Sequence, residues 1–124
     1  MKEKEIIKKY NKYFKTKDLD VGPGWFFLIN ELCSKIDILI KEFFPELLTK
    51  KKPFKIVQVK SKFGGLRFYT TNSIKQIETI IEQYEIKSFE TCEECGRLGD
   101  EVLIDGYLYT LCNKHAKKGA RKKI

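Results

Sequence analysis

Residues 92–115 have the sequence CEECGRLGDEVLIDGYLYTLCNKH, which contains two pairs of residues with the spacing of metal ligands. Two residues separate Cys92 from Cys95, and two again separate Cys112 from His115. Cysteine sulfur and histidine nitrogen at this spacing are typical of structural zinc sites. The sequence therefore predicts one Zn²⁺ ion held by all four residues, with no open position for a catalytic water.

The residues between the two pairs predict how the pairs meet. Gly96 follows the first pair, where a tight knuckle favours a residue that tolerates a positive φ. Strands at 101–104 and 107–111 flank an Asp-Gly dipeptide, which is typical of a β-hairpin turn. Residues 113–122 can form a basic helix that presents the second pair on one face. Knuckle, hairpin and helix in this order predict a treble-clef-like zinc finger over residues 91–124.

Two other interpretations of the cysteines are weaker. A redox pair opens a long helix after a buried strand, and the residues around Cys92 do not predict one. Disulfides are rare in reducing compartments, and residues 1–5 lack the apolar segment of a secretory signal, so we expect a cytoplasmic protein. No run of about 18 apolar residues predicts a membrane span. Cys33, the remaining cysteine, lies on an apolar helical stripe and is predicted to be a core residue.

For residues 1–90 the sequence predicts the main part of an α+β fold, in which helices pack with a short β-hairpin. The strongest pattern covers about 25–43, where apolar residues recur at three- and four-residue steps. A shorter amphipathic pattern predicts a helix over about 3–15. A capping-box match that starts at Ser73 predicts a third helix over about 74–85.

Residues 54–70 predict the β-hairpin of this part of the chain. β-branched and aromatic residues occupy both strands, and Gly64 or Gly65 can supply the positive φ of the turn. The region around the hairpin is basic, because no Asp or Glu lies between Glu46 and Glu78. The hairpin therefore combines aromatic residues with an excess of positive charge.

The charge of the whole chain is unevenly distributed. The formal net charge is +8, with about +5 in residues 1–17 and about +6 in residues 114–124, which leaves about −3 for residues 18–113. Local basic regions attract polyanions or acidic proteins. The alternative is a solvated, lysine-rich surface without a specific partner.

The sequence does not predict an enzyme or a small-molecule substrate. His115 is the only histidine and is already a predicted zinc ligand, so none remains for the catalytic metal and base of a treble-clef nuclease. Gln58-Val59-Lys60 is similar to the Glu-x-Lys of restriction-type nucleases, but the acidic pair that holds Mg²⁺ there is not found upstream. Gly64-Gly65 is predicted to be a turn rather than a phosphate-binding loop, since no Lys-Ser/Thr follows it.

Several blocks together resemble a family of small, mostly uncharacterised zinc-finger proteins of bacteriophages, prophages and bacteria. The resemblance covers most of residues 24–116, and it implies a zinc finger and a mobile-element setting without a settled activity. The Lys-Phe-Gly-Gly-Leu-Arg-Phe-Tyr block at 62–69 is its most specific part. The other blocks are Gly24-Trp25, Leu28-Ile29-x-x-Leu32-Cys33, Cys92-x-x-Cys95-Gly96 and Thr110-Leu111-Cys112-x-x-His115.

One functional hypothesis is binding of nucleic acid or of a nucleoprotein complex. Cations that pair with phosphates, next to rings that stack on bases, are typical of single-strand binding. Because Phe68 alternates with its neighbours, we expect at least one ring of the hairpin to face the core, and the Glu93-Glu94 pair opposes phosphate binding. The candidate binding residues are Lys60, Lys62, Phe63 and Arg67 in the hairpin and Lys117, Lys118 and Arg121 in the tail.

The other hypothesis is a protein–protein role, as an inhibitor or adaptor that binds a host or rival protein. Counter-defence proteins, for example anti-CRISPR proteins, are often small and non-enzymatic chains of this kind. Segregated charge and exposed rings suit such an interface, because aromatic residues and Arg are common anchors of protein interfaces. The sequence leaves both hypotheses open.

Overall fold

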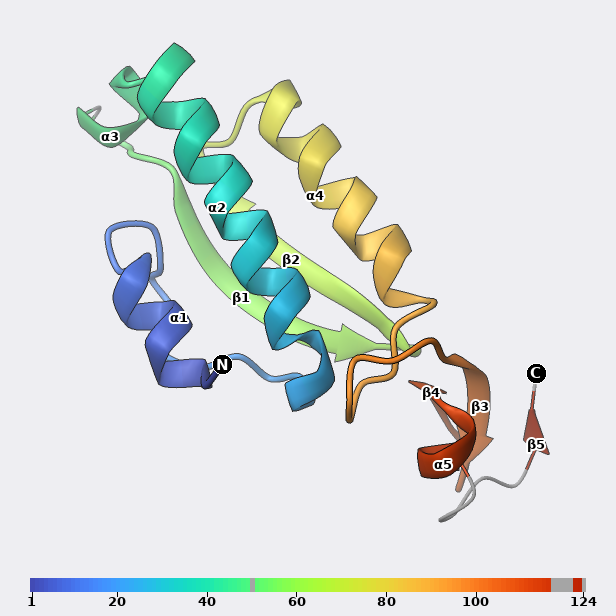
Figure 1. Cartoon of the computed structure of the whole chain (residues 1–124). Helices are drawn as coiled ribbons and strands as arrows, with labels where there is room; N and C mark the ends of the chain where they lie inside the picture. Colours follow the sequence, from blue (N-terminus) through green and yellow to red (C-terminus); the bar gives the residue numbers. More distant parts are fainter. Residues whose placement is uncertain (50, 117–121, 124) are drawn as a thin grey trace.

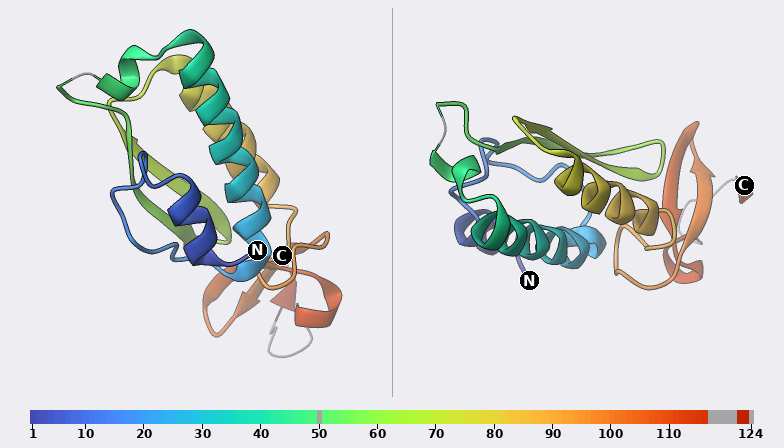
Figure 2. Two further views of the ribbon diagram at one scale, coloured as in Figure 1. Left: turned by 60° about the vertical axis from the view of Figure 1, so that its left-hand side comes forward. Right: turned by 90° about the horizontal axis from the view of Figure 1, so that it is seen from above.

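The computed structural model describes residues 1–49, 51–116 and 122–123, and its fold is α+β as predicted. Helices α2 and α4 lie side by side on one face of the hairpin formed by β1 and β2, and the β3–β4 hairpin with α5 lies at one end of the molecule (Figures 1 and 2). The elements are α1 (Glu3–Lys9), a short 3₁₀ turn η1 (Pro23–Trp25), α2 (Phe26–Phe43), α3 (Glu46–Thr49), β1 (Lys55–Lys62), β2 (Gly65–Thr71), α4 (Lys75–Ser88), β3 (Asp100–Ile104), β4 (Tyr107–Leu111), α5 (Asn113–Ala116) and β5 (Lys122–Lys123).

The two strands β1 and β2 are antiparallel, and both of their outer edges are covered. Along β2, the backbone N–H of Leu66 donates to Ser88 Oγ at 2.8 Å, and that of Phe68 donates to Glu85 Oε2 at 3.0 Å, so side chains of α4 take the place of a neighbouring strand. Along β1, the segment 13–20 forms isolated parallel bridges. Covered edges protect a two-stranded sheet from pairing with other chains.

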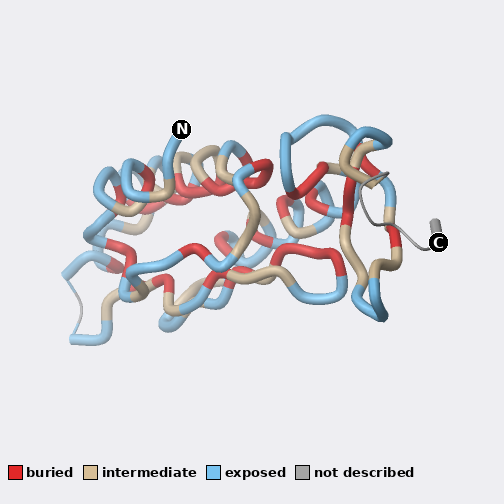
Figure 3. The backbone as a smooth tube through the Cα atoms, turned by 90° about the horizontal axis from the view of Figure 1, so that it is seen from below, coloured by how far each residue is buried: buried red, intermediate tan, exposed pale blue. Residues whose placement is uncertain are grey.

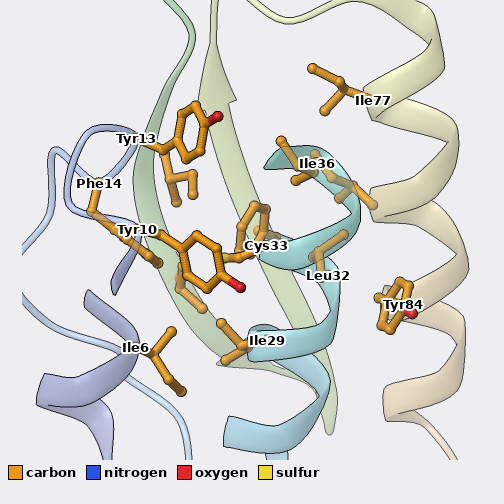
Figure 4. Packing of buried hydrophobic residues seen from close by; sticks show 14 of the residues in the cluster. Ile6, Tyr10, Tyr13, Phe14, Ile29, Leu32, Cys33, Ile36, Ile77 and Tyr84 are labelled. Carbon is orange, nitrogen blue, oxygen red and sulfur yellow. The ribbon is translucent and has the colours of Figure 1, made fainter. Parts of the chain in front are cut away.

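The hydrophobic core lies between the helices and the inner face of this hairpin. Figure 3 shows the buried backbone along these facing sides, and Figure 4 shows side chains of α2 and α4 together with those of the N-terminal segment. Phe68 is 3% exposed and faces the core as expected, whereas Tyr69 is 40% exposed on the outer face. Cys33 is 1% exposed, and its burial raises the pKa of its thiol. It is a core residue, as predicted.

The first helix is shorter than predicted. It ends at Lys9 rather than near residue 15, yet Tyr13 and Phe14 are buried all the same. The reason is that the chain turns after α1 and runs beside β1, where the N–H of Ile56 donates to the carbonyl of Tyr13 at 2.7 Å. The side chains of Tyr13 and Phe14 therefore reach the core from an extended segment and not from a helix.

The capping box predicted at Ser73 is not formed. Helix α4 begins at Lys75 with Ile74 as its N-cap residue, without a side-chain capping hydrogen bond, and it continues to Ser88. The Ser73 hydroxyl lies 3.4 Å from the carbonyl oxygen of Ile74 instead. Among the described residues, no helix is long and apolar enough to cross a membrane.

Candidate metal centre and adjoining groove

The structure brings the four predicted ligands together at one point. Their sulfur and nitrogen atoms all lie within 4.8 Å of one another. The sulfurs of Cys95 and Cys112 are 3.7 Å apart, and Nδ1 of His115 is 3.2 Å from the Cys112 sulfur and 3.6 Å from that of Cys92. A tetrahedral site with metal–sulfur bonds of about 2.3 Å places two sulfurs about 3.8 Å apart. The cluster therefore fits a single metal ion, whereas a disulfide would require a separation of about 2.05 Å.

The first pair of ligands lies in a knuckle that is closed by its own backbone. The N–H of Cys92 donates to the carbonyl of Arg97 at 2.7 Å, and the N–H of Gly96 donates back to the carbonyl of Cys92 at 2.9 Å. Gly96 has a φ of 80°, as the sequence predicts for this position. The two hydrogen bonds direct the sulfurs of Cys92 and Cys95 to the same side.

The β3–β4 hairpin returns the chain to this knuckle. Its turn has φ values of 49° at Asp105 and 85° at Gly106, which is the geometry that the Asp-Gly dipeptide favours. Cys112 directly follows β4, and His115 lies in α5, where the N–H of Ala116 donates to the Cys112 carbonyl at 2.8 Å. The predicted helix over 113–122 is described only for Asn113–Ala116, and residue 122 belongs to β5.

The Cys112 thiol is well suited to bind a metal. A hydrogen bond from the backbone N–H of His115 lowers the pKa of Cys112 to about 6, although partial desolvation opposes this shift. The thiolate is the form of cysteine that binds a metal ion. The centre is covered on one side by a small apolar cluster, which consists of Cys92, Val102 and Leu111 with the partly buried Ile104, Tyr109, Cys112 and Ala116.

Glu93, within the knuckle, connects the metal centre to the rest of the protein. It is 7% exposed, and its carboxylate accepts hydrogen bonds from the Thr110 N–H at 2.7 Å and from the Ser61 hydroxyl at 3.1 Å. Its own carbonyl accepts one from the Gly24 N–H at 2.8 Å. Burial raises the pKa of this carboxyl. The Glu93 oxygens are thus occupied by partners within the protein, whereas Glu94 is exposed, and the expectation that this pair opposes phosphate binding stays a prediction.

Glycines allow the close approach between the main body (residues 1–90) and the finger (residues 91–116). A side chain on Gly24 would overlap the carbonyl oxygen of Cys92, and one on Gly22 would overlap that of Glu93. Next to Gly24, the indole N–H of Trp25 donates to the Thr91 carbonyl at 2.8 Å. Blocks that are far apart in the sequence therefore meet at this junction.

A groove of about 920 Å³ lies beside the junction, between the two hairpins. Phe63, in the turn between β1 and β2, is 64% exposed, and Tyr107, directly after the turn between β3 and β4, is 69% exposed. The charged side chains and the exposed rings of its lining are Asp20, Lys60, Lys62, Phe63, Glu93 and Tyr107. The groove thus combines exposed rings with lysine side chains.

The predicted binding residues have different positions relative to this groove. Lys60, Lys62 and Phe63 line it. Arg67 is the cross-strand partner of Lys60 but is not among the lining residues, and its Nε atom is buried without a hydrogen-bond partner. The predictions for Lys117, Lys118 and Arg121 lie outside the described residues.

Asp20 and Tyr107 line the groove but are not among the predicted binding residues. Tyr107 follows an Asp-Gly turn and alternates with Tyr109, a local pattern that would have marked an aromatic strand beside the metal site. Asp20 has no such local signal in the sequence. It lies in the groove because its backbone forms a β-bridge with Lys60, a contact between segments far apart in the chain.

Among the described residues, the four-ligand cluster is the only group of three or more histidine, cysteine or carboxylate side chains placed to hold a metal ion. Comparison of the chain with protein-family models, with curated proteins and with solved structures finds no match.

Proposed function

We propose that this chain is a non-enzymatic accessory protein with a structural zinc ion, and that it binds nucleic acid or a nucleoprotein complex through the groove. The observation that carries the proposal is the presence of Lys60, Lys62 and two exposed rings in one groove. Phosphates pair with cations and bases stack on rings, so nucleic acid uses both kinds of side chain at once.

Zinc is the metal that the ligand set supports best. Three sulfurs and one imidazole nitrogen in a tetrahedral arrangement are a common structural zinc site. Cys92, Cys95, Cys112 and His115 would fill all four positions, so that the ion stabilises the finger and leaves no position for a reacting water. The order of knuckle, hairpin and short helix supports a treble-clef-like finger.

The charges of the groove are compatible with a polyanion. Lys62 Nζ lies 5.5 Å from the centre of the Phe63 ring, so a cation and a ring are presented together. The Glu93 carboxylate accepts two hydrogen bonds and is nearly covered. Asp20 is the exposed carboxylate of the lining. Because the two carboxylates equal the two lysines in formal charge, the favourable positive charge is local to Lys62 beside Phe63.

A salt series with fluorescently labelled DNA and RNA, single- and double-stranded, tests the proposal. The Lys60→Ala/Lys62→Ala variant is expected to bind more weakly, and its salt dependence is expected to flatten by about 0.9 per lost phosphate contact on duplex DNA, or about 0.7 on single strands. The matched control is Lys4→Ala/Lys75→Ala, which removes the same charge from two exposed sites outside the groove. A chain ending at residue 116 measures what the basic tail adds.

Equal losses in the two double variants would contradict the proposal, because they would show that only net charge matters. Binding that disappears entirely with the tail would contradict it as well. Unchanged affinity of the Lys4→Ala/Lys75→Ala control, with a clear loss for the groove variant, is the expected result.

A second candidate function is an inhibitor or adaptor that binds a host or rival protein. It is favoured by Phe27 and Leu98, which are 66% and 81% exposed and line a second groove of about 470 Å³ with Glu31, Lys87 and Glu90. Exposed apolar side chains inside a polar rim resemble the centre of a protein interface. Phe27→Ser and Leu98→Ser are expected to abolish capture of such a protein and to leave nucleic-acid affinity unchanged.

A further inference from the structure

Phe63 has a backbone conformation that is unfavourable for a bulky residue. Its φ is 55° and that of Gly64 is 79°, so both central residues of the β1–β2 turn are in the left-handed region. Glycine, asparagine and aspartate are the usual residues at the first of these positions, since a large side chain there is strained. The Phe63 ring is 64% exposed, so burial does little to offset this strain.

The second hairpin of the same chain provides an internal reference. Its turn has nearly the same geometry, with φ values of 49° and 85°, but it is formed by Asp105 and Gly106. The β1–β2 turn therefore does not require a phenylalanine for its conformation. Strain held at an exposed position indicates a role other than folding.

Tyr107 places a second exposed ring in the same groove. It follows the β3–β4 turn, whereas Phe63 lies within the β1–β2 turn, so each hairpin contributes one exposed ring near its tip. Lys60 and Lys62 line the groove from the β1 side. Two exposed rings and two lysines thus line one groove, and Lys62 Nζ lies 5.5 Å from the centre of the Phe63 ring. Rings together with cations are how proteins hold unpaired bases and the backbone that connects them.

We propose that the groove binds a single strand of nucleic acid, with bases stacked on Phe63 and Tyr107 and the backbone beside Lys60 and Lys62. This inference rests on the function proposed above and specifies its ligand. In a duplex the bases are already stacked on one another and present only their edges in the grooves, so their faces are not accessible to rings. In an unpaired strand the faces are free.

A substitution at Asp20 tests whether the ligand of the groove is negatively charged. The backbone of Asp20 forms a parallel β-bridge with that of Lys60. The Asp20 carboxylate side chain is exposed and lines the groove. A polyanionic strand is repelled by this charge, so Asp20→Asn is expected to tighten binding by about two- to fivefold at low salt. A cationic ligand would bind more weakly to the same variant.

The experiment measures the affinity of the zinc-loaded full chain for single strands of about 12 nucleotides, as DNA and as RNA, and for the matching duplexes. Single strands are expected to bind at least about tenfold more tightly than duplexes. Phe63→Asn is expected to reduce single-strand affinity about tenfold and to raise the Tm by about 2–5 °C, because asparagine tolerates the left-handed conformation. Phe63→Tyr retains the ring and is expected to retain the affinity.

The matched control is Phe43→Asn, which removes a similarly exposed ring (66% exposed) outside the groove and is expected to leave affinity unchanged. Duplex binding as tight as single-strand binding, or equal losses for Phe63→Asn and Phe43→Asn, would overturn the single-strand inference while nucleic-acid binding itself stands. No binding to any strand or duplex would overturn the proposed function together with this inference. Tighter single-strand binding that depends on Phe63 and Tyr107 supports both.

Discussion

The main body and the finger differ in what stabilises them. In the main body, buried apolar side chains from Ile6 to Tyr84 form one continuous cluster. In the finger, the buried cluster consists of Cys92, Val102 and Leu111. Burial of apolar area contributes about 25 cal/mol per Å², so the main body has a sufficient source of stability in its own side chains. The finger does not, and it has instead four side chains placed to hold one metal ion.

The two parts are joined by polar contacts and by close backbone packing. The finger contacts the β1–β2 hairpin through Thr110, whose hydroxyl donates to the Gly64 carbonyl at 2.6 Å. The backbone N–H of Thr110 in turn donates to Glu93 within the finger. This junction is also one end of the groove. The groove is therefore expected to depend on both the apolar core and the metal centre, since residues of both parts line it.

The largest effect is expected from loss of the metal. Chelation, or the variant Cys112→Ser, removes about 10 kcal/mol or more of apparent folding free energy from the finger, because binding of a structural metal ion is coupled to folding. The main body is expected to remain folded on its apolar cluster. Metal content and amide hydrogen exchange, resolved by residue, measure the two responses separately.

Cys33→Ala is the matched control for this prediction. Cys33 is buried among apolar residues of the main body and lies outside the metal cluster, so the variant is expected to keep one zinc ion per chain. If chelation unfolded residues 1–90 together with the finger, the two parts would share one source of stability and the comparison would fail.

A substitution at the junction is expected to have an intermediate effect. Gly24→Ala places a methyl group against the Cys92 carbonyl and 2.6 Å from the Gly96 nitrogen, which costs about 2–3 kcal/mol of unfolding free energy. Gly106→Ala is a suitable reference, because it meets no atom within 4 Å and carries only the cost of its φ of 85°, about 1 kcal/mol.

Thermal unfolding and Trp25 fluorescence measure this effect, since the Trp25 indole donates to the Thr91 carbonyl across the junction. Equal destabilisation by the two alanine variants would show that the finger can move away from the main body at no cost.

The smallest effect is expected within the main body. The Asp37 carboxylate accepts a hydrogen bond from Tyr13 at 2.6 Å and pairs with Lys41 at 3.1 Å and Lys12 at 3.5 Å. Burial alone would raise the pKa of Asp37, but these partners lower it below its ordinary value. Asp37→Asn is therefore expected to cost about 1 kcal/mol at neutral pH.

The pH dependence of this cost has a defined sign. A carboxyl whose pKa is lowered by folding stabilises the protein above its ordinary pKa of about 3.9, and the stabilisation is lost as the pH falls through the lowered value. The difference in unfolding free energy between the wild type and Asp37→Asn, measured by urea unfolding, is expected to become smaller below pH of about 4. A constant difference would assign the effect to packing instead of charge.

Local patterns predicted the parts of the structure that depend on local chemistry. The sequence predicted that the four ligands meet, because metal-ligand geometry restricts their spacing. It also predicted the Asp105-Gly106 turn and the role of Gly96, because positive φ values restrict which residues can occupy these positions. Periodicity identified α2 because its apolar stripe faces a single core. The end of α1 was not predictable, since Tyr13 and Phe14 would have continued the same pattern in a helix.

Residue types and their spacing were sufficient to predict the α+β class, the four candidate ligands and the positive charge of the β1–β2 hairpin. The folded chain was needed to find that Glu93 is a buried connector, that Asp20 forms a backbone β-bridge with Lys60, and that Phe63 and Tyr107 line one groove. These contacts join segments far apart in the chain, and the packing of one surface against another is not encoded in any local pattern.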